Sequence, residues 1–225
     1  MREVFVIGAG GHGCEVVSYI TQDPQAKCIG VIDDKVPPGR ICGVEILGGL
    51  QAMDRLARSN PEKQFHFITA LGDNATRRRV VDRIEALALP NLTAWTLTHP
   101  ASHIGPEVSV GAGTLFSPNT IVTARSQIGD HCILNIKASI SHDVRLGDFV
   151  NLNPNTTIAG NVEIGEGAYI GAGATVIEKI RIGKGVVVGA GSVVIRDVPD
   201  FVTVVGVPAQ IIHKSMKPIE RTKEA

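Results

Sequence analysis

Between residues 104 and 199, every sixth residue is a large apolar side chain, and the spacing never slips. The sixteen positions are Ile104, Val110, Phe116, Val122, Ile128, Leu134, Ile140, Leu146, Leu152, Ile158, Ile164, Ile170, Val176, Ile182, Val188 and Val194. The residue four places later is mostly small or β-branched, as in Thr114 and Ala174. Glycine or asparagine often follows the apolar residue directly, as at Gly129 and Asn135.

A six-residue period indicates short strands joined by corners. An α-helix needs apolar residues every three to four positions, and frequent glycine destabilises it. In a coil of short strands, the apolar residue fills the interior, and the following glycine or asparagine is expected to adopt the unusual dihedral angles of a corner. Hexapeptide periodicity is typical of a parallel β-helix, whose stacked coils share one continuous core.

Residues 1–96 have a different pattern, in which apolar strands alternate with amphipathic helices. The expected strands cover residues 4–7, 27–32, 65–71 and 92–97, and the expected helices cover residues 14–20, 50–58 and 74–87. This alternation predicts a small α/β domain with a parallel sheet of about four strands. We therefore divide the chain into an α/β domain (1–96), a β-helix (97–210) and a charged tail (211–225).

A glycine-rich turn follows the first expected strand. Gly8, Gly10 and Gly13 match the pattern G-x-G-x-x-G, and Asp33 lies 20 residues beyond Gly13. Backbone N–H groups at such a turn, together with the next helix N-terminus, can hold a phosphate. A nicotinamide cofactor, a nucleoside diphosphate or a simple tight turn would each explain the motif. A full dinucleotide-binding fold needs two mononucleotide halves, so the short domain favours a single nucleoside diphosphate.

A second candidate site lies in the hexapeptide region. His142 and Asp143 are the third and fourth residues of the hexad from Ile140, so they should face outward or lie at a corner. A histidine beside a carboxylate can act as a general base, although two solvated polar residues would show the same pattern. Asn135 is similarly open to a structural or a functional reading. We expect no metal site, because His131 and His142 are less than two hexads apart, where stacking on one face would require three.

Composition and cysteine spacing limit the remaining classes. The chain has 22 basic and 22 acidic residues, which argues against nucleic acid or an anionic membrane as the main partner. No signal peptide or membrane span is expected. The cysteines, none of them in a C-x-x-C motif, are Cys14, Cys28, Cys42 and Cys132. Packed free thiols in a reducing cytoplasm are the simplest interpretation, and no cysteine is placed as a nucleophile.

Several motifs together resemble one family over nearly the whole chain. They are GAGGHG, DDK, ALGDNATR, LNIKASISHDVRLGDF and a terminal GVPA. The chain resembles the sialic-acid O-acetyltransferase-like sugar acyltransferases, hexapeptide-repeat proteins that include bacterial N-acetyltransferases of nucleotide-linked 4-amino-sugars. The resemblance implies a left-handed parallel β-helix after a small Rossmann-like domain, and a homotrimer. It also implies a nucleotide sugar in the first domain and acetyl-CoA between adjacent subunits.

The resemblance also assigns roles to individual residues. His142 matches the catalytic base, Asp143 the acidic residue that raises its basicity, and Asn135 a polar active-site residue. The positions that match nucleotide-sugar contacts are Gly10, Gly11, His12, Asp33, Asp34, Lys35 and Gly72. The positions that match the acetyl-CoA groove are Asn151, Ala172 and Ala190. Several family members have a second histidine where this chain has Asn151.

The function implied is transfer of an acetyl group from acetyl-CoA to the 4-amino group of a nucleotide-linked sugar, with UDP favoured over GDP. No metal or redox cofactor is required. A sugar O-acetyltransferase of the same fold and a nicotinamide-nucleotide-binding regulatory protein are the alternatives, and a pure scaffold would need neither site. A regulatory protein would keep the glycine turn without needing His142.

Overall fold

The computed structural model describes residues 1–214, and the chain divides into two compact units. The first unit comprises Met1–Gly72 and Thr76–Pro100, and the second comprises Asp73–Ala75 and the chain from Ala101 onward. Residues 211–214 of the expected tail are the end of a strand, and the rest of that tail, residues 215–225, lies outside the described residues. Among the residues described, no helix is long and apolar enough to cross a membrane.

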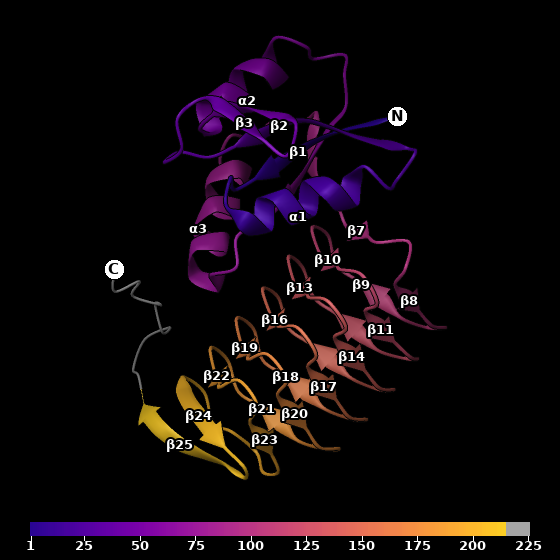
Figure 1. The fold of residues 1–225 in the computed structure, drawn as a ribbon, viewed down its shortest axis with the longest axis vertical. Coiled ribbons are helices and arrows are strands. Elements are labelled where there is room, and N and C mark those ends of the chain that lie inside the picture. Colours follow the sequence, from indigo (N-terminus) through magenta and orange to yellow (C-terminus); the bar gives the residue numbers. More distant parts are fainter. Residues whose placement is uncertain (215–225) are drawn as a thin grey trace. The chain divides into compact units, whose positions relative to one another are not determined.

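The first unit is a six-stranded sheet with three helices (Figure 1). Its strands are β1 (Arg2–Ile7), β2 (Ala26–Ile32), β3 (Gly39–Ile41), β4 (Val44–Gly48), β5 (Phe65–Thr69) and β6 (Leu92–Ala94). Its helices are α1 (Gly11–Ile20), α2 (Leu50–Arg58) and α3 (Asn74–Glu85), and a short strand β7 (Leu97–Thr98) follows β6. The strand order is β3-β4-β2-β1-β5-β6, and all neighbours are parallel except β3 and β4.

Strand β1 lies at the centre of this sheet because its residues are apolar without interruption. Val4, Phe5 and Val6 are fully buried, as expected for a parallel strand that is covered on both faces. The predicted parallel α/β domain is therefore confirmed, although the sheet has more strands than the four we expected.

The additional strands are a hairpin, β3–β4, in a segment that we predicted to be a loop. Its turn is formed by Cys42 and Gly43, which both have positive φ angles, of 46° and 81°. A turn of two such residues matches the twist of an antiparallel pair. Beyond the hairpin, β4 pairs in parallel with β2 and so enlarges the sheet.

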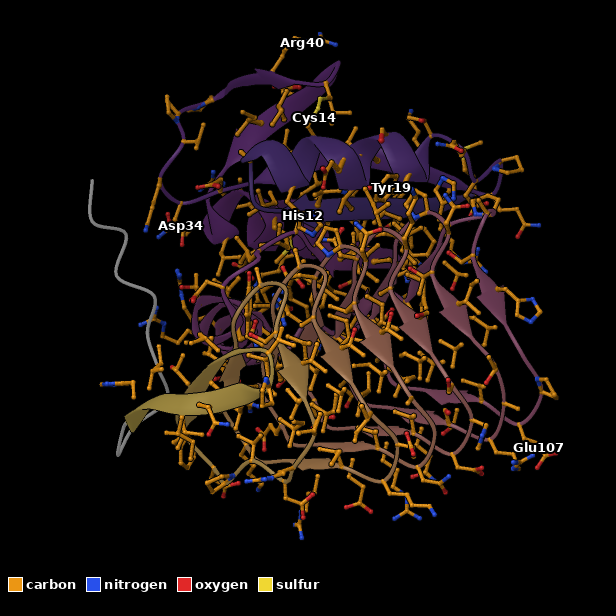
Figure 2. All side chains as sticks on the ribbon, turned by 60° about the horizontal axis from the view of Figure 1, so that its bottom comes forward. His12, Cys14, Tyr19, Asp34, Arg40 and Glu107 are labelled. Atoms are coloured by element: carbon orange, nitrogen blue, oxygen red, sulfur yellow. A yellow bond between two sulfur atoms is a disulfide. The ribbon has the colours of Figure 1, made fainter. Side chains whose placement is uncertain are left out.

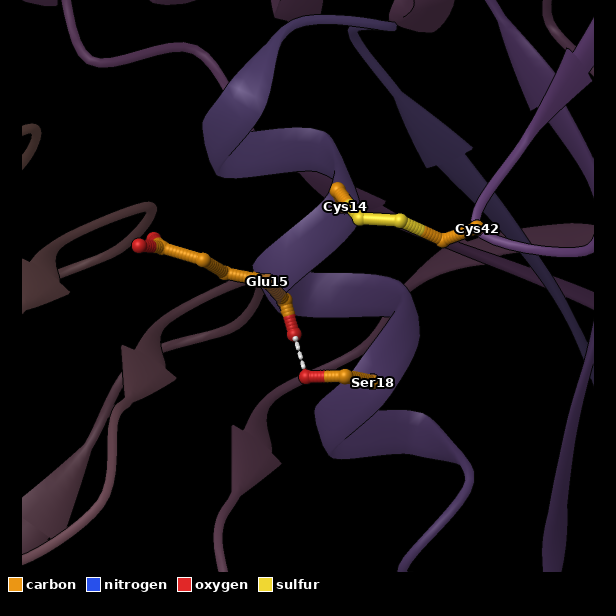
Figure 3. The surroundings of a disulfide bond; sticks show 4 residues. All are labelled: Cys14, Glu15, Ser18 and Cys42. Atoms are coloured by element: carbon orange, nitrogen blue, oxygen red, sulfur yellow. Dashed lines mark hydrogen bonds between the residues drawn. A yellow bond between two sulfur atoms is a disulfide. The ribbon is translucent and has the colours of Figure 1, made fainter.

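A disulfide joins this hairpin to helix α1 (Figure 3). It links Cys14 in α1 to Cys42 in the turn, with Cα atoms 5.6 Å apart. The prediction of free thiols is therefore wrong for these two residues, whereas Cys28 and Cys132 remain thiols. The expectation failed because Cys14 and Cys42 are 28 residues apart in the sequence. Only the β3–β4 hairpin, which we did not predict, brings them together.

The second unit is a parallel β-helix of sixteen two-residue strands, each ending at one of the predicted apolar positions. The strands are β8 (His103–Ile104), β9 (Ser109–Val110), β10 (Leu115–Phe116), β11 (Ile121–Val122), β12 (Gln127–Ile128), β13 (Ile133–Leu134), β14 (Ser139–Ile140), β15 (Arg145–Leu146), β16 (Asn151–Leu152), β17 (Thr157–Ile158), β18 (Glu163–Ile164), β19 (Tyr169–Ile170), β20 (Thr175–Val176), β21 (Arg181–Ile182), β22 (Val187–Val188) and β23 (Val193–Val194). The predicted fold class is thus confirmed.

Three faces make up each coil, and successive coils lie one above another (Figure 1). Face 1 contains β10, β13, β16, β19 and β22, face 2 contains β8, β11, β14, β17, β20 and β23, and face 3 contains β9, β12, β15, β18 and β21. Equivalent residues are therefore three hexads apart, as in the pairing of Leu134 with Leu152. We call the turn from face 1 to face 2 the first corner, that from face 2 to face 3 the second, and that from face 3 to face 1 the third.

The interior of the coils is an apolar column. Leu134, Leu152 and Ile170 stack in register on face 1 and are fully buried. A hairpin of β24 (Val202–Gly206) and β25 (Ala209–Lys214) continues face 1 beyond β22. This hairpin contains the GVPA stretch at its turn.

The corner glycines have a different role from the one we expected. At fifteen successive corners the left-handed residue lies three places after the apolar position, and ten of these residues are not glycine. Directly after the apolar positions of face 3, glycine is required by lack of space. A Cβ added at Gly147 would lie 2.6 Å from the backbone nitrogen of Glu166 in the next coil. All five residues that follow the strands of face 3 are glycines, namely Gly111, Gly129, Gly147, Gly165 and Gly183.

Two alanine substitutions distinguish these roles. Gly147→Ala should lower the free energy of unfolding by about 3 kcal/mol, because a backbone atom must move. Gly173→Ala, which has a φ of +67° and open space at its Cβ, should cost about 1 kcal/mol from backbone strain alone. Chemical denaturation at one protomer concentration measures both. Equal losses would contradict the steric role of Gly147.

Candidate functional site

The predicted nucleotide-binding residues lie at one edge of the first unit. Strands β1, β2 and β5 are parallel, so their carboxyl ends meet at the same edge of the sheet. The turn of Gly10–His12 follows β1, Asp33–Lys35 follows β2, and Gly72 follows β5. In open α/β sheets, this edge is where ligands bind.

The glycines of the turn differ in what they allow. Gly8 has a φ of +115°, which disfavours any other residue. A Cβ on Gly13 would collide with the carbonyl oxygen of Gly8, so the helix packs directly on the turn. By contrast, a Cβ on Gly10 or Gly11 would meet nothing within 4 Å. Because no side chain caps the N-terminus of α1, the open glycines leave its first N–H groups accessible to an anion.

The carboxylate of Asp33 supports this turn directly. It accepts hydrogen bonds from the backbone N–H of Ala9, at 2.9 Å, and from that of Lys35, at 2.8 Å. Asp34 accepts a hydrogen bond from the backbone N–H of Leu50 and forms an ion pair with Arg83 at 2.7 Å. The hydrogen bond from Arg83 is the main reason that the pKa of Asp34 lies below its usual value. Asp33 thus holds the backbone of the glycine turn, whereas Asp34 holds the start of helix α2.

His12 is placed beside the open part of the turn. It lies on helix α1 (Figure 2). Its Nδ1 is 2.9 Å from Oε2 of Glu15, one helical turn further on. Its Nε2 is buried and has no hydrogen-bond partner among the described residues. Buried polar atoms nearly always have a hydrogen-bond partner, so this nitrogen is an exception. Lys35 and Gly72 are both exposed near the same strand ends.

The second candidate site forms at the second corner, where His142 and Asp143 follow β14. The Nδ1 atom of His142 lies 2.7 Å from Oδ2 of Asp143. Arg125, one coil earlier, binds the same carboxylate through two atoms, with Nε 2.8 Å from Oδ1 and Nη2 2.9 Å from Oδ2. The His142 side chain is 54% exposed. The pair therefore faces outward, as predicted, in an accessible position.

The arrangement determines which nitrogen of His142 can accept a proton. Arg125, followed by His142, lowers the pKa of Asp143 to about 2, so this carboxylate is ionised at neutral pH. An ionised carboxylate only accepts hydrogen bonds. Neutral His142 must therefore carry its proton on Nδ1, which leaves the lone pair on Nε2 available. A base with a fixed tautomer is what proton removal from a substrate requires.

Arg125 and Gly160 are two site residues that the sequence analysis missed. Gly160 lies one coil after His142, and a Cβ there would be 2.9 Å from Nε2 of the imidazole. The ring therefore lies over a residue that has no side chain. A signal for both was present, because Arg125 precedes Asp143 by three hexads and Gly160 follows His142 by the same interval.

The other predicted site residues lie away from His142 within one chain. Asn135 is at the first corner, before β14, where its side-chain oxygen accepts a hydrogen bond from the backbone N–H of Ile136. Ala172 and Ala190 are exposed at the same corner, in successive coils, joined by the hydrogen bond from the N–H of Gly191 to the carbonyl of Ala172. Asn151 is buried on face 1. Face 2 thus separates the predicted base from the predicted acetyl-CoA groove.

Comparisons with known proteins agree with both units. Residues 3–84 match the family model described as the PglD N-terminal domain, and residues 161–196 match the one described as bacterial transferase hexapeptide (six repeats). The chain is 28% identical over 143 residues to GDP-perosamine N-acetyltransferase of Escherichia coli O157:H7, and 37% identical over 115 residues to UDP-N-acetylbacillosamine N-acetyltransferase of Bacillus subtilis. These alignments span 61% and 51% of each chain, less than two thirds of the relatives' lengths.

Solved structures match over nearly the full length. A variant of GDP-perosamine N-acetyltransferase from Caulobacter crescentus, in complex with CoA and GDP-perosamine, has a TM-score of 0.87 at 32% identity, covering 95% of this chain and 98% of that one. The acetyltransferase domain of PglB from Neisseria gonorrhoeae, in complex with acetyl coenzyme A, has a TM-score of 0.84 at 34% identity, covering 94% and 99%.

The stacked hexads, the two matching family models and the full-length structural neighbours identify a hexapeptide-repeat acyltransferase. Within that class, the chain belongs to the sialic-acid O-acetyltransferase-like sugar acyltransferase family, as its motifs suggested. Its relatives and structural neighbours in that family are N-acetyltransferases.

Proposed function

We propose that this protein transfers an acetyl group from acetyl-CoA to the 4-amino group of a sugar linked to a nucleoside diphosphate. The observation that carries the proposal is the His142–Asp143 pair, held with Nε2 free on an exposed corner of the β-helix. The open N-terminus of α1 beside Gly10 and Gly11 supplies a place for the diphosphate. Relatives that act on such sugars support the same reading.

The reaction is direct transfer in a ternary complex. The neutral sugar amine attacks the thioester carbonyl of acetyl-CoA, and the new C–N bond forms as the nitrogen gains positive charge. His142 Nε2 accepts the proton from that nitrogen, and CoA leaves as its thiolate, which is then protonated. A positioned base contributes about 10²- to 10⁴-fold to such a rate. The remaining acceleration comes from holding the two substrates in line.

The proposal also covers which nucleotide carries the sugar and where in the cell the enzyme acts. The family resemblance favours UDP over GDP, whereas the matched relatives include enzymes named for each nucleotide. Mass spectrometry after incubation with acetyl-CoA and UDP- or GDP-linked 4-amino-sugars distinguishes the two. A product only with hydroxyl-bearing sugars would favour the O-acetyltransferase alternative, and binding of NAD alone would favour the regulatory protein. We place the enzyme in the cytoplasm on its class of activity and not on its cysteines, since Cys14 and Cys42 form a disulfide.

A homotrimer would join the parts of the site that one chain keeps apart. His142 lies at the second corner, whereas Asn135, Ala172 and Ala190 lie at the first, on the other side of face 2. A neighbouring subunit packed against face 2 would bring its own first corner to His142. Light scattering should therefore give about three times the chain mass of 23.8 kDa. A stable monomer that retains full activity would contradict this assembly.

Replacing His142 tests the base. His142→Ala should fold normally, because its exposed side chain fills no core position. Its kcat should fall by about 10²- to 10⁴-fold with little change in KM, because proton removal matters mainly in the transition state. His213→Ala, at an exposed histidine in β25, is the matched control. Wild-type single-turnover rates for His142→Ala would rule out this role.

Replacing Gly11 tests the nucleotide site. Gly11→Val adds a branched side chain where a phosphate would approach the backbone, and should raise the KM for the sugar nucleotide about tenfold or more. The KM for acetyl-CoA should hardly change. Gly39→Val, at an exposed glycine that also lacks a positive φ, is the control. An unchanged KM for the sugar nucleotide in Gly11→Val would place the nucleotide elsewhere.

A further inference from the structure

A column of polar residues runs along the second corner, and Arg125 lies within it. Its members, one from each successive coil, are Glu107, Arg125, Asp143, Asn161 and Lys179. All five have left-handed backbones, with φ between 47° and 62°. Glu107, between β8 and β9, is in the first coil and lies at one end of the β-helix (Figure 2). Because the backbone conformation repeats from coil to coil, each side chain leaves its corner from an equivalent position.

The contact between Arg125 and Asp143 is a fork on both carboxylate oxygens. Such a pair fixes the plane of the carboxylate as well as its position. The two side chains are 54% and 33% exposed, and an exposed ion pair adds little to stability. This two-atom contact therefore contributes little to stability, and its main effect is to orient the carboxylate oxygens of Asp143.

We propose that Arg125 is a positioning residue for proton transfer, acting on His142 through Asp143. The inference rests on the proposed function, in which His142 is the base. Arg125 holds the carboxylate so that Oδ2 faces His142 Nδ1, which keeps the ring in the tautomer with Nε2 free. It also places a positive charge on the carboxylate that contacts the imidazole.

The other charged residues at this corner are Glu107, Glu178 and Lys179. Glu107 lies one coil before Arg125 and acts on the guanidinium, which has a raised pKa chiefly because of Asp143. Beyond His142, Gly160 offers no charge, and Glu178 and Lys179 lie one coil further. Arg125 is thus the cation in contact with Asp143. Its removal makes the electrostatic potential at His142 more negative. With Arg125 gone, the unshielded carboxylate favours the imidazolium, so His142 should keep its proton to a higher pH.

The test compares Arg125→Gln, Arg125→Lys and Asp143→Asn in the full-length protein. Arg125→Gln should move the acidic limb of the pH–kcat/KM profile up by about half a pH unit or more, whereas Asp143→Asn should move it down. Arg125→Gln should also lower kcat about 3- to 30-fold with KM nearly unchanged, because Asp143 is free to rotate. Arg125→Lys restores the charge without the fork, so it should recover the pH limb and only part of kcat.

Arg58→Gln is the matched control, since Arg58 forms another exposed pair with a carboxylate, that of Asp54 on helix α2. It should leave both kcat and the pH limb unchanged. An NMR titration of the His142 ring measures its protonation midpoint directly, without turnover. The His142 signal is identified by its absence from the spectrum of His142→Ala. If the NMR midpoint moves as expected while His142→Ala keeps full activity, the proposed base fails, and the role of Arg125 in proton transfer fails with it. If Arg125→Gln leaves both the NMR midpoint and kcat at wild-type values, the positioning role is overturned.

Discussion

The hydrogen bonds between successive coils set the three-hexad register on which the second unit depends. Each strand bonds to its equivalents in the coils before and after it, as the N–H of Arg145 does to the carbonyl of Val162. Because every coil has the same length, a side chain at one corner always meets the equivalent residues of the neighbouring coils. This register brings Arg125 beside Asp143 and puts Gly160 under His142. Inserting a single residue between those coils would separate all of these pairs while leaving each residue present.

The hexad core could be predicted from the sequence because every sixth position is occupied by a large apolar side chain. All sixteen apolar residues end strands as expected, since an interior position accepts only such side chains. The backbone conformation at the corners was harder to predict. The left-handed position is occupied by residues as different as Lys137, Phe149 and Asp143, so composition conceals the conformation that the register imposes. Glycine marked another constraint, the close approach of the next coil, and its frequency alone could not distinguish lack of space from dihedral freedom.

In the first unit, the buried strands were predictable and the edge was not. Strand β1 is apolar throughout its buried part, whereas β3 has three residues and follows two prolines, a pattern that we assigned to a loop. The Cys14–Cys42 disulfide depends on that edge and was missed with it. The spacing of Asp33 from the glycines did place the residue at the turn. Its bond to the N–H of Ala9 shows that its carboxylate also holds the turn itself in shape.

The division between core and corner separates what stabilises the fold from what carries out its chemistry. The free energy of folding in the β-helix comes mainly from the buried column, in which Leu134, Leu152 and Ile170 exclude water. The charged residues at the second corner are exposed and contribute little to that free energy. Since the register fixes their backbone whatever their identity, the corner can present a histidine, a carboxylate or a guanidinium at similar cost to the fold. The His142 site therefore needs only the right residues in neighbouring coils, on a scaffold whose stability lies elsewhere.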